Sequence, residues 1–272
     1  MPQKNNKKLL NLGCGQRCHS DWINLDLVSS SPQITICNLL KGIPYDKNYF
    51  DVVYHSHLLE HFSKTEATNF INECYRVLKP GGISRVAVPD LEEIINNYQK
   101  YFHSALKGDK QAIANYDWIM LELLDQCTRR SGGGEMGKYL LQDNIPNQDF
   151  VKQRIGYFYD LIRKSKSKKP LVSKSIISKI SDKMISLSRK FFELLPGNQY
   201  DKISKFILSG ENHLWMYDRF SLARLLKQSG FKQPKVVTAF NSQIPNWTKY
   251  YLDAEPDGTI YKPDSIFMEA IK

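Results

Sequence analysis

A glycine turn between two short apolar runs constrains the fold of this chain more than any other feature. Leu9–Leu12 form the first run, Gly13-Cys14-Gly15 turn the chain, and Trp22–Leu27 form a second run that contains Asp26. Glycine lets a backbone approach a ligand closely, because it has no Cβ and adopts positive φ freely. An acid at the end of the second run can accept both hydrogen bonds of a ribose diol. The segment predicts a strand, a nucleotide-binding turn and a second strand; a tight turn without a ligand is the alternative.

Downstream of this turn, segments typical of strands and helices alternate. Ser63 with Glu66 three residues later forms a capping-box pattern that predicts the start of a helix, and Lys79-Pro80-Gly81-Gly82 predicts its end. We expect strands at residues 8–12, 22–27, 34–39, 50–54, 83–88, 235–240 and 265–272, and helices at 63–78, 91–102, 117–126, 149–164 and 218–229. This alternation predicts a parallel sheet that binds ligands at the carboxyl ends of its strands.

Several motifs follow one another in a family-specific order. LNLGCG, HSHLLEHF, YRVLKPGG and RVAVPDLE fall within residues 8–93, and HLWMYD and IPNW…LDAEPDGTIYKPDSIFMEAIK come later. In this order they resemble the class I S-adenosylmethionine-dependent methyltransferases, in the type 11-like subgroup found with bacterial capsule and lipopolysaccharide sugar-modification pathways. The resemblance implies a Rossmann-like α/β fold: a seven-stranded, mostly parallel sheet, an antiparallel last strand and a helical insertion between strands five and six. The chain departs from the usual pattern because no long helix fits before Asp26.

Residues 103–210 interrupt the alternation and predict a separate part of the chain. We expect a Rossmann-like core at 1–102 and 211–272 and a helical insertion at 103–210. Only seven residues precede the first predicted strand, whereas many relatives cover their substrate with N-terminal helices. The insertion is therefore expected to supply the cover over the substrate site.

The positive charge of the chain is concentrated in one segment. Residues 163–190 hold ten Lys or Arg and one acid, Asp182, while the formal net charge of the whole chain is +10. The remainder is nearly neutral, which argues against nucleic-acid binding by the protein as a whole. Residues 171–195 predict a basic amphipathic helix. Two interpretations stay open: part of the cap, which we favour, or a peripheral membrane contact through residues 163–195.

The cysteines and the distribution of apolar residues indicate a cytoplasmic protein. The five cysteines form no CxxC pair, so reduced thiols are expected rather than a zinc site or a disulfide framework. No run of about 18 apolar residues predicts a membrane span, and the first residues do not match a secretory signal. The sequence leaves the oligomeric state open.

The resemblance implies S-adenosylmethionine as cofactor and places its binding residues. The glycine turn would lie along the amino-acid portion of the cofactor. Asp26 would bind its ribose, and the residues after the third strand would contact its adenine. The predicted cofactor-binding residues are Leu12, Gly13, Cys14, Gly15, Asp26, Asn38, Leu39, His55 and Ser56.

The segment from His55 to His61 is the densest polar group in the chain, and it admits three interpretations. His57, Glu60 and His61 match the inverted zincin motif, in which two histidines hold zinc. The same residues could line a methyl-transfer site, with or without a divalent ion, because an acid-x-x-acid-histidine arrangement binds a metal in ubiquinone and small-RNA O-methyltransferases. Here His57 replaces the first acid, which disfavours magnesium. Third, Glu60 and His61 could only cap and orient the following helix.

Four residues are candidates for acid–base catalysis: His57, His61, Asp90 and His213. Histidine suits proton transfer at neutral pH. Asp90 follows the fifth predicted strand, and its alternative role is to cap the helix after it. His213 follows the insertion, and its alternative role is that of a packed core residue.

Substrate binding is assigned to Arg129, Arg130 and Trp215. The two arginines precede Gly132-Gly133-Gly134, and an arginine pair can bind the diphosphate of a nucleotide sugar. The segment lacks the Lys-Ser/Thr ending of a P-loop.

The expected function is an O-methyltransferase that acts on a sugar or nucleotide-sugar hydroxyl in bacterial surface polysaccharide biosynthesis. The choice of a sugar comes only from the resemblance. A methyltransferase for another small metabolite is the first alternative. A non-catalytic scaffold that binds the cofactor or associates with a membrane is the second.

Overall fold

The computed structural model describes residues 7–167, 206 and 210–272 and divides into two compact units. The sheet unit comprises Met1–Glu93 and Leu214–Lys272, and the helical unit comprises Ile94–His213. The predicted basic helix at 171–195 lies outside the described residues. Of the helices that the structure describes, none is both long and apolar enough to span a membrane.

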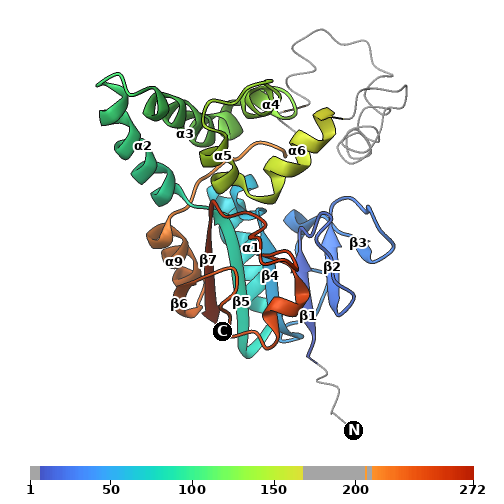
Figure 1. The fold of residues 1–272 in the computed structure, drawn as a ribbon. Coiled ribbons are helices and arrows are strands. Elements are labelled where there is room, and N and C mark those ends of the chain that lie inside the picture. The colour runs from blue at the N-terminus through green and yellow to red at the C-terminus, as the bar shows by residue number, and fades with distance from the viewer. Residues whose placement is uncertain (1–6, 168–205, 207–209) are drawn as a thin grey trace, which may run out of the picture. The chain divides into compact units, whose positions relative to one another are not determined.

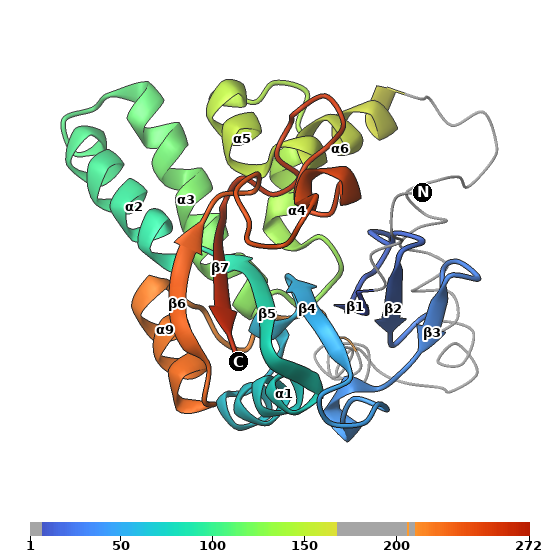
Figure 2. The ribbon, with the colours of Figure 1, turned by 90° about the horizontal axis from the view of Figure 1, so that it is seen from below.

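The sheet unit is built on a mixed sheet of seven strands among the described residues (Figures 1 and 2). The strands are β1 (Leu9–Leu12), β2 (Trp22–Asp26), β3 (Ile34–Ile36), β4 (Phe50–Ser56), β5 (Leu78–Pro89), β6 (Lys232–Val237) and β7 (Ser265–Ile271). Their order across the sheet is β3-β2-β1-β4-β5-β7-β6, and β7 runs antiparallel to both of its neighbours. The predicted Rossmann-like sheet with an antiparallel last strand is confirmed.

One face of this sheet is covered by two helices, α1 (Lys64–Val77) and α9 (Arg219–Gln228) (Figure 2). Alternate strand residues face them, because successive side chains of a strand point to opposite faces. Leu10, Leu12 and Val53 pack in one core with residues of both helices. The predicted capping box starts α1: the Ser63 hydroxyl accepts from the Glu66 backbone and the Glu66 carboxylate accepts from the Ser63 backbone.

The other face of the sheet is covered by the connection between β6 and β7, residues 238–264. Leu9, Trp22 and Tyr54 form a second core with Trp247 and Leu252 from this connection. No helix occurs between β1 and β2, where residues 13–21 join two parallel neighbours. Such a connection usually needs a dozen or more residues and a helix. The prediction that no long helix precedes Asp26 is therefore confirmed. The β6–β7 connection covers this face instead.

A fully buried arginine anchors that loop to the sheet. Arg85 of β5 is 0% exposed and lies 2.7 Å from the Asp253 carboxylate and 2.7 Å from that of Glu269. Its remaining donors bind the carbonyl oxygens of Thr238 and Asn241 at 2.8 and 3.1 Å. Arg85 thus pairs with two carboxylates, and all three buried groups are hydrogen-bonded, which lowers the cost of burying them.

The helical unit supplies the predicted insertion between β5 and β6. Its helices are α2 (Leu91–Ala105, whose first turn belongs to the sheet unit), α3 (Lys110–Thr128), α4 (Gly134–Leu140), α5 (Gln148–Ile155) and α6 (Tyr157–Ser167). A buried ion pair between Arg154 and Glu122, 2.7 Å apart, joins α5 to α3. The covering role predicted for residues 103–210 stays a prediction.

Several predicted element boundaries differ from those observed, for local reasons. The helix predicted at 149–164 is two helices, because Gly156 has φ of +54° and ends α5. The helix predicted at 117–126 begins earlier, since the Asp109 carboxylate caps α3. The strand predicted at 34–39 stops at Ile36, because Asn38 caps a 3-10 turn, η1 (Leu39–Lys41).

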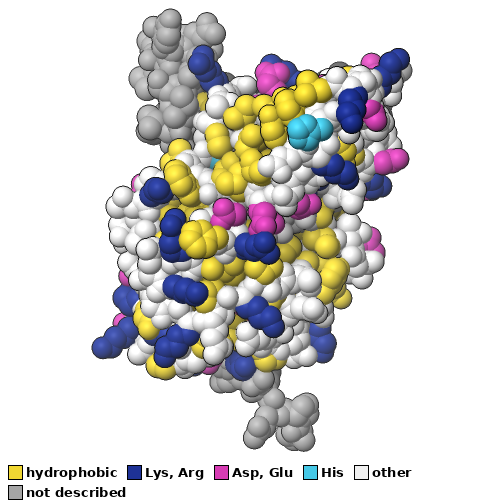
Figure 3. Space-filling model, turned by 90° about the vertical axis from the view of Figure 1, so that its left-hand side faces the viewer, with side chains coloured by type: hydrophobic (Ala, Val, Ile, Leu, Met, Phe, Trp, Pro, Cys, Tyr) yellow, Lys and Arg dark blue, Asp and Glu magenta, His cyan; other side chains and the backbone are white. Residues whose placement is uncertain are grey.

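Charged side chains are dispersed on the face of the molecule that Figure 3 draws. Lys and Arg side chains lie there among hydrophobic, uncharged and acidic ones. A continuous basic strip, which would follow a phosphate backbone, is not seen on this face. The expectation that the protein does not bind nucleic acid stays a prediction.

Candidate active site

The glycine turn folds back onto β2 as a tight loop. The amides of Gly13 and Cys14 both donate to the Leu25 carbonyl, at 2.8 and 3.3 Å. Gly13 and Gly15 have φ of +62° and +54°, in the left-handed region that glycine adopts without strain. A Cβ on Gly13 would come within 2.9 Å of Leu58, whereas a Cβ on Gly15 would meet nothing within 4 Å. Gly15 therefore presents its backbone to open space, as a ligand-binding turn requires.

Asp26 holds this loop in place with its carboxylate. One carboxylate oxygen accepts from the Gly15 amide at 2.8 Å, and the other accepts from the Val28 amide at 3.1 Å. The residue is partly exposed. Because each carboxylate oxygen can accept more than one hydrogen bond, Asp26 can order the loop and still bind a diol.

Two buried asparagines replace the missing helix as supports for residues 13–21. The Asn11 amide donates to the Arg17 carbonyl at 2.7 Å and to the Asn24 side chain at 3.0 Å. Asn24 in turn donates to the carbonyls of His19 and Trp22. The loop is therefore tied from beneath to β1 and β2.

Arg17 ties the same loop to the β6–β7 connection. Its guanidinium forms an ion pair with Glu255, donates to the Tyr251 carbonyl at 3.0 Å, and lies 3.7 Å from the ring centre of Tyr261. The sequence analysis did not predict these contacts.

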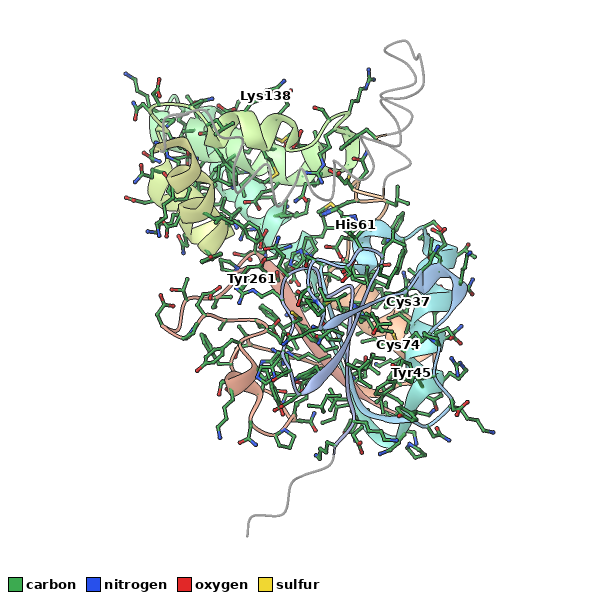
Figure 4. The ribbon with its side chains drawn as sticks, turned by 90° about the vertical axis from the view of Figure 1, so that its right-hand side faces the viewer. Cys37, Tyr45, His61, Cys74, Lys138 and Tyr261 are labelled. Atoms are coloured by element: carbon green, nitrogen blue, oxygen red, sulfur yellow. The ribbon has the colours of Figure 1, made fainter. Side chains whose placement is uncertain are left out.

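A pocket opens between the glycine loop, the end of β4 and the β6–β7 connection. Its lining consists of Asn11, Gly13, Cys14, Gly15, Gln16, Arg17, Tyr54, Ser56, His57, Leu252, Tyr261 and Lys262. β1 and β4 are neighbours in the sheet. After β1 the chain continues to β2 on one side, and after β4 it continues to β5 on the other side. α/β sheets bind ligands at such a reversal of strand order. Tyr261 and His61 lie at this same edge of the sheet (Figure 4).

His57 is the pocket residue with the most defined environment. Its Nδ1 lies 3.1 Å from the Glu60 carboxylate, and its Nε2 lies 2.7 Å from the Ser265 hydroxyl. Burial, reinforced by the charge of Lys262, lowers the pKa of His57 to about 4, although Glu60 opposes this shift. The imidazole is therefore neutral at pH 7 and able to accept a proton.

The segment around His57 is not the helix that an inverted zincin needs. That motif places two histidines on one face of an α-helix. His57 instead has φ of +49°, and only η2 (Leu59–His61) is helical, as a short 3-10 turn. The zincin interpretation of the sequence is wrong.

A comparison with protein families agrees with this geometry. The family model described as "Methyltransferase domain" matches residues 10–86, which contain the glycine loop, Asp26 and His57. Residues 10–86 are therefore similar to a methyltransferase domain. The match covers less than half of the chain, and it supports S-adenosylmethionine as the methyl donor.

Solved structures of methyltransferases are similar to the chain at low identity. An S-adenosylmethionine-dependent methyltransferase from Archaeoglobus fulgidus has a TM-score of 0.40 at 12% identity, covering 99% of this chain and 87% of that one. A possible histamine N-methyltransferase from Thermotoga maritima has a TM-score of 0.39 at 10% identity, covering 100% and 84%. No curated protein sequence matches the chain.

In the sheet unit, some predicted cofactor residues line the pocket and others lie in the core. Ser56 and Cys14 line the pocket, and burial, then Asp26, raises the pKa of the Cys14 thiol to about 12. Leu12 is fully buried. His55 is also fully buried, with its ring 5.0 Å from that of Phe70, on the face of β4 opposite Ser56. A role for His55 in cofactor binding would have to use its backbone.

Asn38 and Leu39 lie at the turn after β3. The Asn38 side chain accepts from the Leu40 amide at 3.0 Å and so caps η1, while Leu39 is buried in the core. The Asn38 residue as a whole is exposed. The adenine contact expected of these two residues stays a prediction.

Asp90 caps α2, the alternative role that the sequence suggested. Its carboxylate accepts from the amides of Glu92 and Glu93 at 3.0 and 3.3 Å. Burial raises the pKa of Asp90. Its catalytic role stays a prediction.

His61 and Trp215 belong to the sheet unit. His61 is the last residue of η2 and is partly exposed (Figure 4). The Trp215 amide donates to the Glu60 carbonyl at 3.1 Å, and the Lys64 ammonium lies 4.1 Å from the centre of its ring. The Trp215 side chain is exposed, as a substrate contact would require.

The other predicted residues belong to the helical unit. The Arg129 guanidinium donates to the Glu211 carbonyl at 2.7 Å, Arg130 is exposed, and His213 is buried with its amide bound to the Gln126 carbonyl.

The backbone amides at the start of α4, after the glycine-rich segment, already bind a carboxylate. The Asp125 carboxylate accepts from the amides of Glu135 and Met136 at 2.8 and 3.2 Å. Phosphates bind such helix amides when they are free. The carboxylate therefore weakens the case for a diphosphate cradle beside Arg129 and Arg130.

The main residues that the sequence analysis missed are Asn11, Lys262 and Ser265. Asn11 left a signal, because an amide inside an otherwise apolar strand is buried only when it has partners. Lys262 and Ser265 lie in the terminal motif that carried part of the resemblance, but nothing in that motif connects them to His57.

Proposed function

We propose that the protein is an O-methyltransferase that acts on a sugar or nucleotide-sugar hydroxyl in bacterial surface polysaccharide biosynthesis. The observation that carries the O-methyl part is the neutral imidazole of His57, which lines the same pocket as the glycine loop. A hydroxyl must lose its proton as it is methylated, and a neutral imidazole can accept that proton. The sugar part is supported by the motif resemblance alone.

The glycine loop, which lines the pocket, and Asp26, which binds the Gly15 amide, fit the cofactor. The glycine loop exposes backbone to open space at Gly15, and the partly exposed Asp26 carboxylate can accept from a ribose. S-adenosylmethionine supplies an electrophilic methyl group when bound. The protein then has to orient the acceptor, which contributes about 7–11 kcal/mol for well-aligned reactants, and to exclude water. A general base adds roughly 100- to 10,000-fold in rate.

Calorimetric titration with S-adenosylmethionine and with its demethylated product tests the cofactor half of this proposal. Asp26→Ala should abolish binding of both, because it removes the ribose acceptor and releases the Gly15 amide. Asp21→Ala is the matched control, since Asp21 is an exposed acid in the same loop region. Wild-type affinity in Asp26→Ala would show that the ribose is bound elsewhere.

Mass spectrometry of nucleotide sugars incubated with enzyme and S-adenosylmethionine tests the acceptor half. The expected result is the gain of one methylene on a hydroxyl of at least one nucleotide sugar. His57→Gln should lower turnover while leaving the calorimetric affinity for S-adenosylmethionine unchanged. If no sugar gains mass, the sugar assignment is wrong, and an undiminished rate in His57→Gln would remove the base assignment.

A further inference from the structure

The side chains of Glu60, His57 and Ser265 lie in one row beside the pocket. Glu60 comes from η2, His57 from the turn after β4, and Ser265 from the first position of β7. The Glu60 carboxylate lies 3.1 Å from His57 Nδ1, and the Ser265 hydroxyl lies 2.7 Å from His57 Nε2. An acid, an imidazole and a hydroxyl in this order are the parts of a proton relay.

The strands place the hydroxyl end of this row at the ligand-binding edge of the sheet. Ser265 pairs with Pro89, the last residue of β5, and the His57 amide donates to the Ala87 carbonyl at 2.9 Å. Ser265 and His57 thus both lie beside the carboxyl end of β5. Ser265 is partly exposed, whereas the Glu60 side chain is 1% exposed. The row therefore runs from a buried acid to a residue that is partly exposed.

The chemistry of these groups assigns the direction of the hydrogen bonds. An ionised carboxylate can only accept, so the hydrogen on the neutral imidazole belongs on Nδ1, toward Glu60. Nε2 then carries the lone pair, and the Ser265 hydroxyl donates to it. The basic nitrogen of His57 is consequently already occupied by Ser265, so a proton reaches that nitrogen through the serine hydroxyl unless the serine moves away.

We propose that Ser265 relays the proton of the acceptor hydroxyl to His57, which Glu60 holds in the required tautomer. The acceptor oxygen bonds to the methyl carbon as the bond from that carbon to the sulfonium sulfur breaks, with its electron pair passing to sulfur. The acceptor proton moves to Ser265 Oγ while the Ser265 proton moves to His57 Nε2. His57 becomes an imidazolium beside the Glu60 carboxylate. This inference rests on the proposed O-methyl transfer.

The charged and titratable groups that act on His57 are consistent with transient rather than permanent protonation. Glu60 favours the imidazolium, whereas Lys262 and His61 oppose it together with burial. The ring is therefore neutral between turnovers and can release its proton after each one.

Proton–nitrogen correlation NMR of the cofactor-free protein tests the relay without any acceptor. The spectrum of His57, assigned by its absence in His57→Gln, should show a neutral ring at pH 7 with hydrogen on Nδ1. Ser265→Ala should shift the Nε2 resonance only. A hydrogen on Nε2, or a doubly protonated ring at pH 7, would overturn the proposal, because Nε2 could not then accept from serine.

Kinetics of serine variants test the same relay in turnover, with a nucleotide sugar identified by the screen above. Ser265→Ala should lower kcat by about 100- to 10,000-fold, the range of general-base catalysis, with unchanged calorimetric affinity for S-adenosylmethionine. Ser265→Thr should recover most of the rate, since it keeps a hydroxyl. Ser84→Ala is the matched control, because Ser84 is a buried strand serine whose hydroxyl has no hydrogen-bond partner in the described part of the chain.

The outcomes separate the relay from the proposed function. A wild-type kcat in Ser265→Ala would exclude the relay even if sugars are methylated. If no sugar is methylated by the wild type, the proposed function is wrong, and the tautomer of His57 still decides whether Ser265 can donate to it.

Discussion

Lys262 is a cation that acts directly on the imidazole of His57. Its charge is the second cause, after burial, of the lowered pKa of His57. Lys262→Met should therefore raise the pKa of His57 from about 4 toward its ordinary value of 6.5, because the imidazolium no longer faces a positive charge while Glu60 still favours it. The shift should be partial, since burial remains.

NMR titration of the His57 ring measures this shift. Lys64→Met is the matched control, because Lys64 lies over Trp215 and is not among the groups that shift His57. An unchanged pKa in Lys262→Met would show that Lys262 does not act on the ring.

The ring nitrogens of His57 also bear on the open question of a metal. Both already have partners, since Nδ1 lies 3.1 Å from Glu60 and Nε2 lies 2.7 Å from Ser265. A metal on His57 would have to displace one of these neighbours. His57 is therefore expected not to hold a metal, and its ring resonances in NMR should be the same after exhaustive chelation and with added Mg²⁺ or Zn²⁺. A shift of those resonances with one ion would contradict this.

At the scale of elements, the β6–β7 connection depends on buried charge. Asp253→Ala leaves Arg85 paired with Glu269 alone and removes the acceptor of the Tyr54 hydroxyl, and leaving a buried donor without its partner costs about 1–3 kcal/mol. We expect the free energy of unfolding to fall by this order and the fluorescence of Trp247, which belongs to the connection, to change.

Urea denaturation followed by tryptophan fluorescence measures the effect of Asp253→Ala. Lys79→Ala is the comparison, because the Lys79–Asp51 pair is 39% and 27% exposed and such pairs contribute about 0–1 kcal/mol. Equal losses in both variants would mean that the buried network does not hold the loop.

Elements set by local signals could be predicted, whereas long-range contacts could not. The capping box of Ser63 and Glu66 lies within one turn of helix, so these residues alone predict where α1 begins. The glycine loop and Asp26 are similarly close in sequence. By contrast, His57 and Ser265 are 208 residues apart, and Arg85 and Asp253 are 168 apart. Those pairs meet only because β7 inserts beside β5, and no local pattern records which side chains then face one another.

At the scale of the whole molecule, buried neutral histidines link stability to pH. The pKa of His55 and that of His57 are each lowered to about 4, by burial first, from 6.5. The unfolded chain therefore binds protons at these residues where the folded chain does not. Their contribution to stability is fully present above pH 6.5 and is lost as pH falls toward 4, by about 1.4 kcal/mol per pH unit for each histidine.

Urea denaturation between pH 4 and pH 8 checks this linkage. His55→Phe should remove about half of the histidine-dependent slope below pH 6.5, because the new ring cannot be protonated and replaces an imidazole that already packs against Phe70. The difference between wild type and variant isolates His55 from the carboxylates that titrate nearby. An identical slope in the two proteins would show that His55 titrates normally in the fold.

The strand order also has a consequence for how the protein is made. β5 ends at Pro89 and its neighbour β7 begins at Ser265, so this edge of β5 has no partner until residues 90–265 have been synthesised. At ~5–20 residues per second, that interval is on the order of 10–35 s. An apolar edge exposed for so long can pair with other nascent chains. Expression yield should therefore depend strongly on chaperone supply and growth temperature. This dependence should be stronger than expected from the stability of the folded protein.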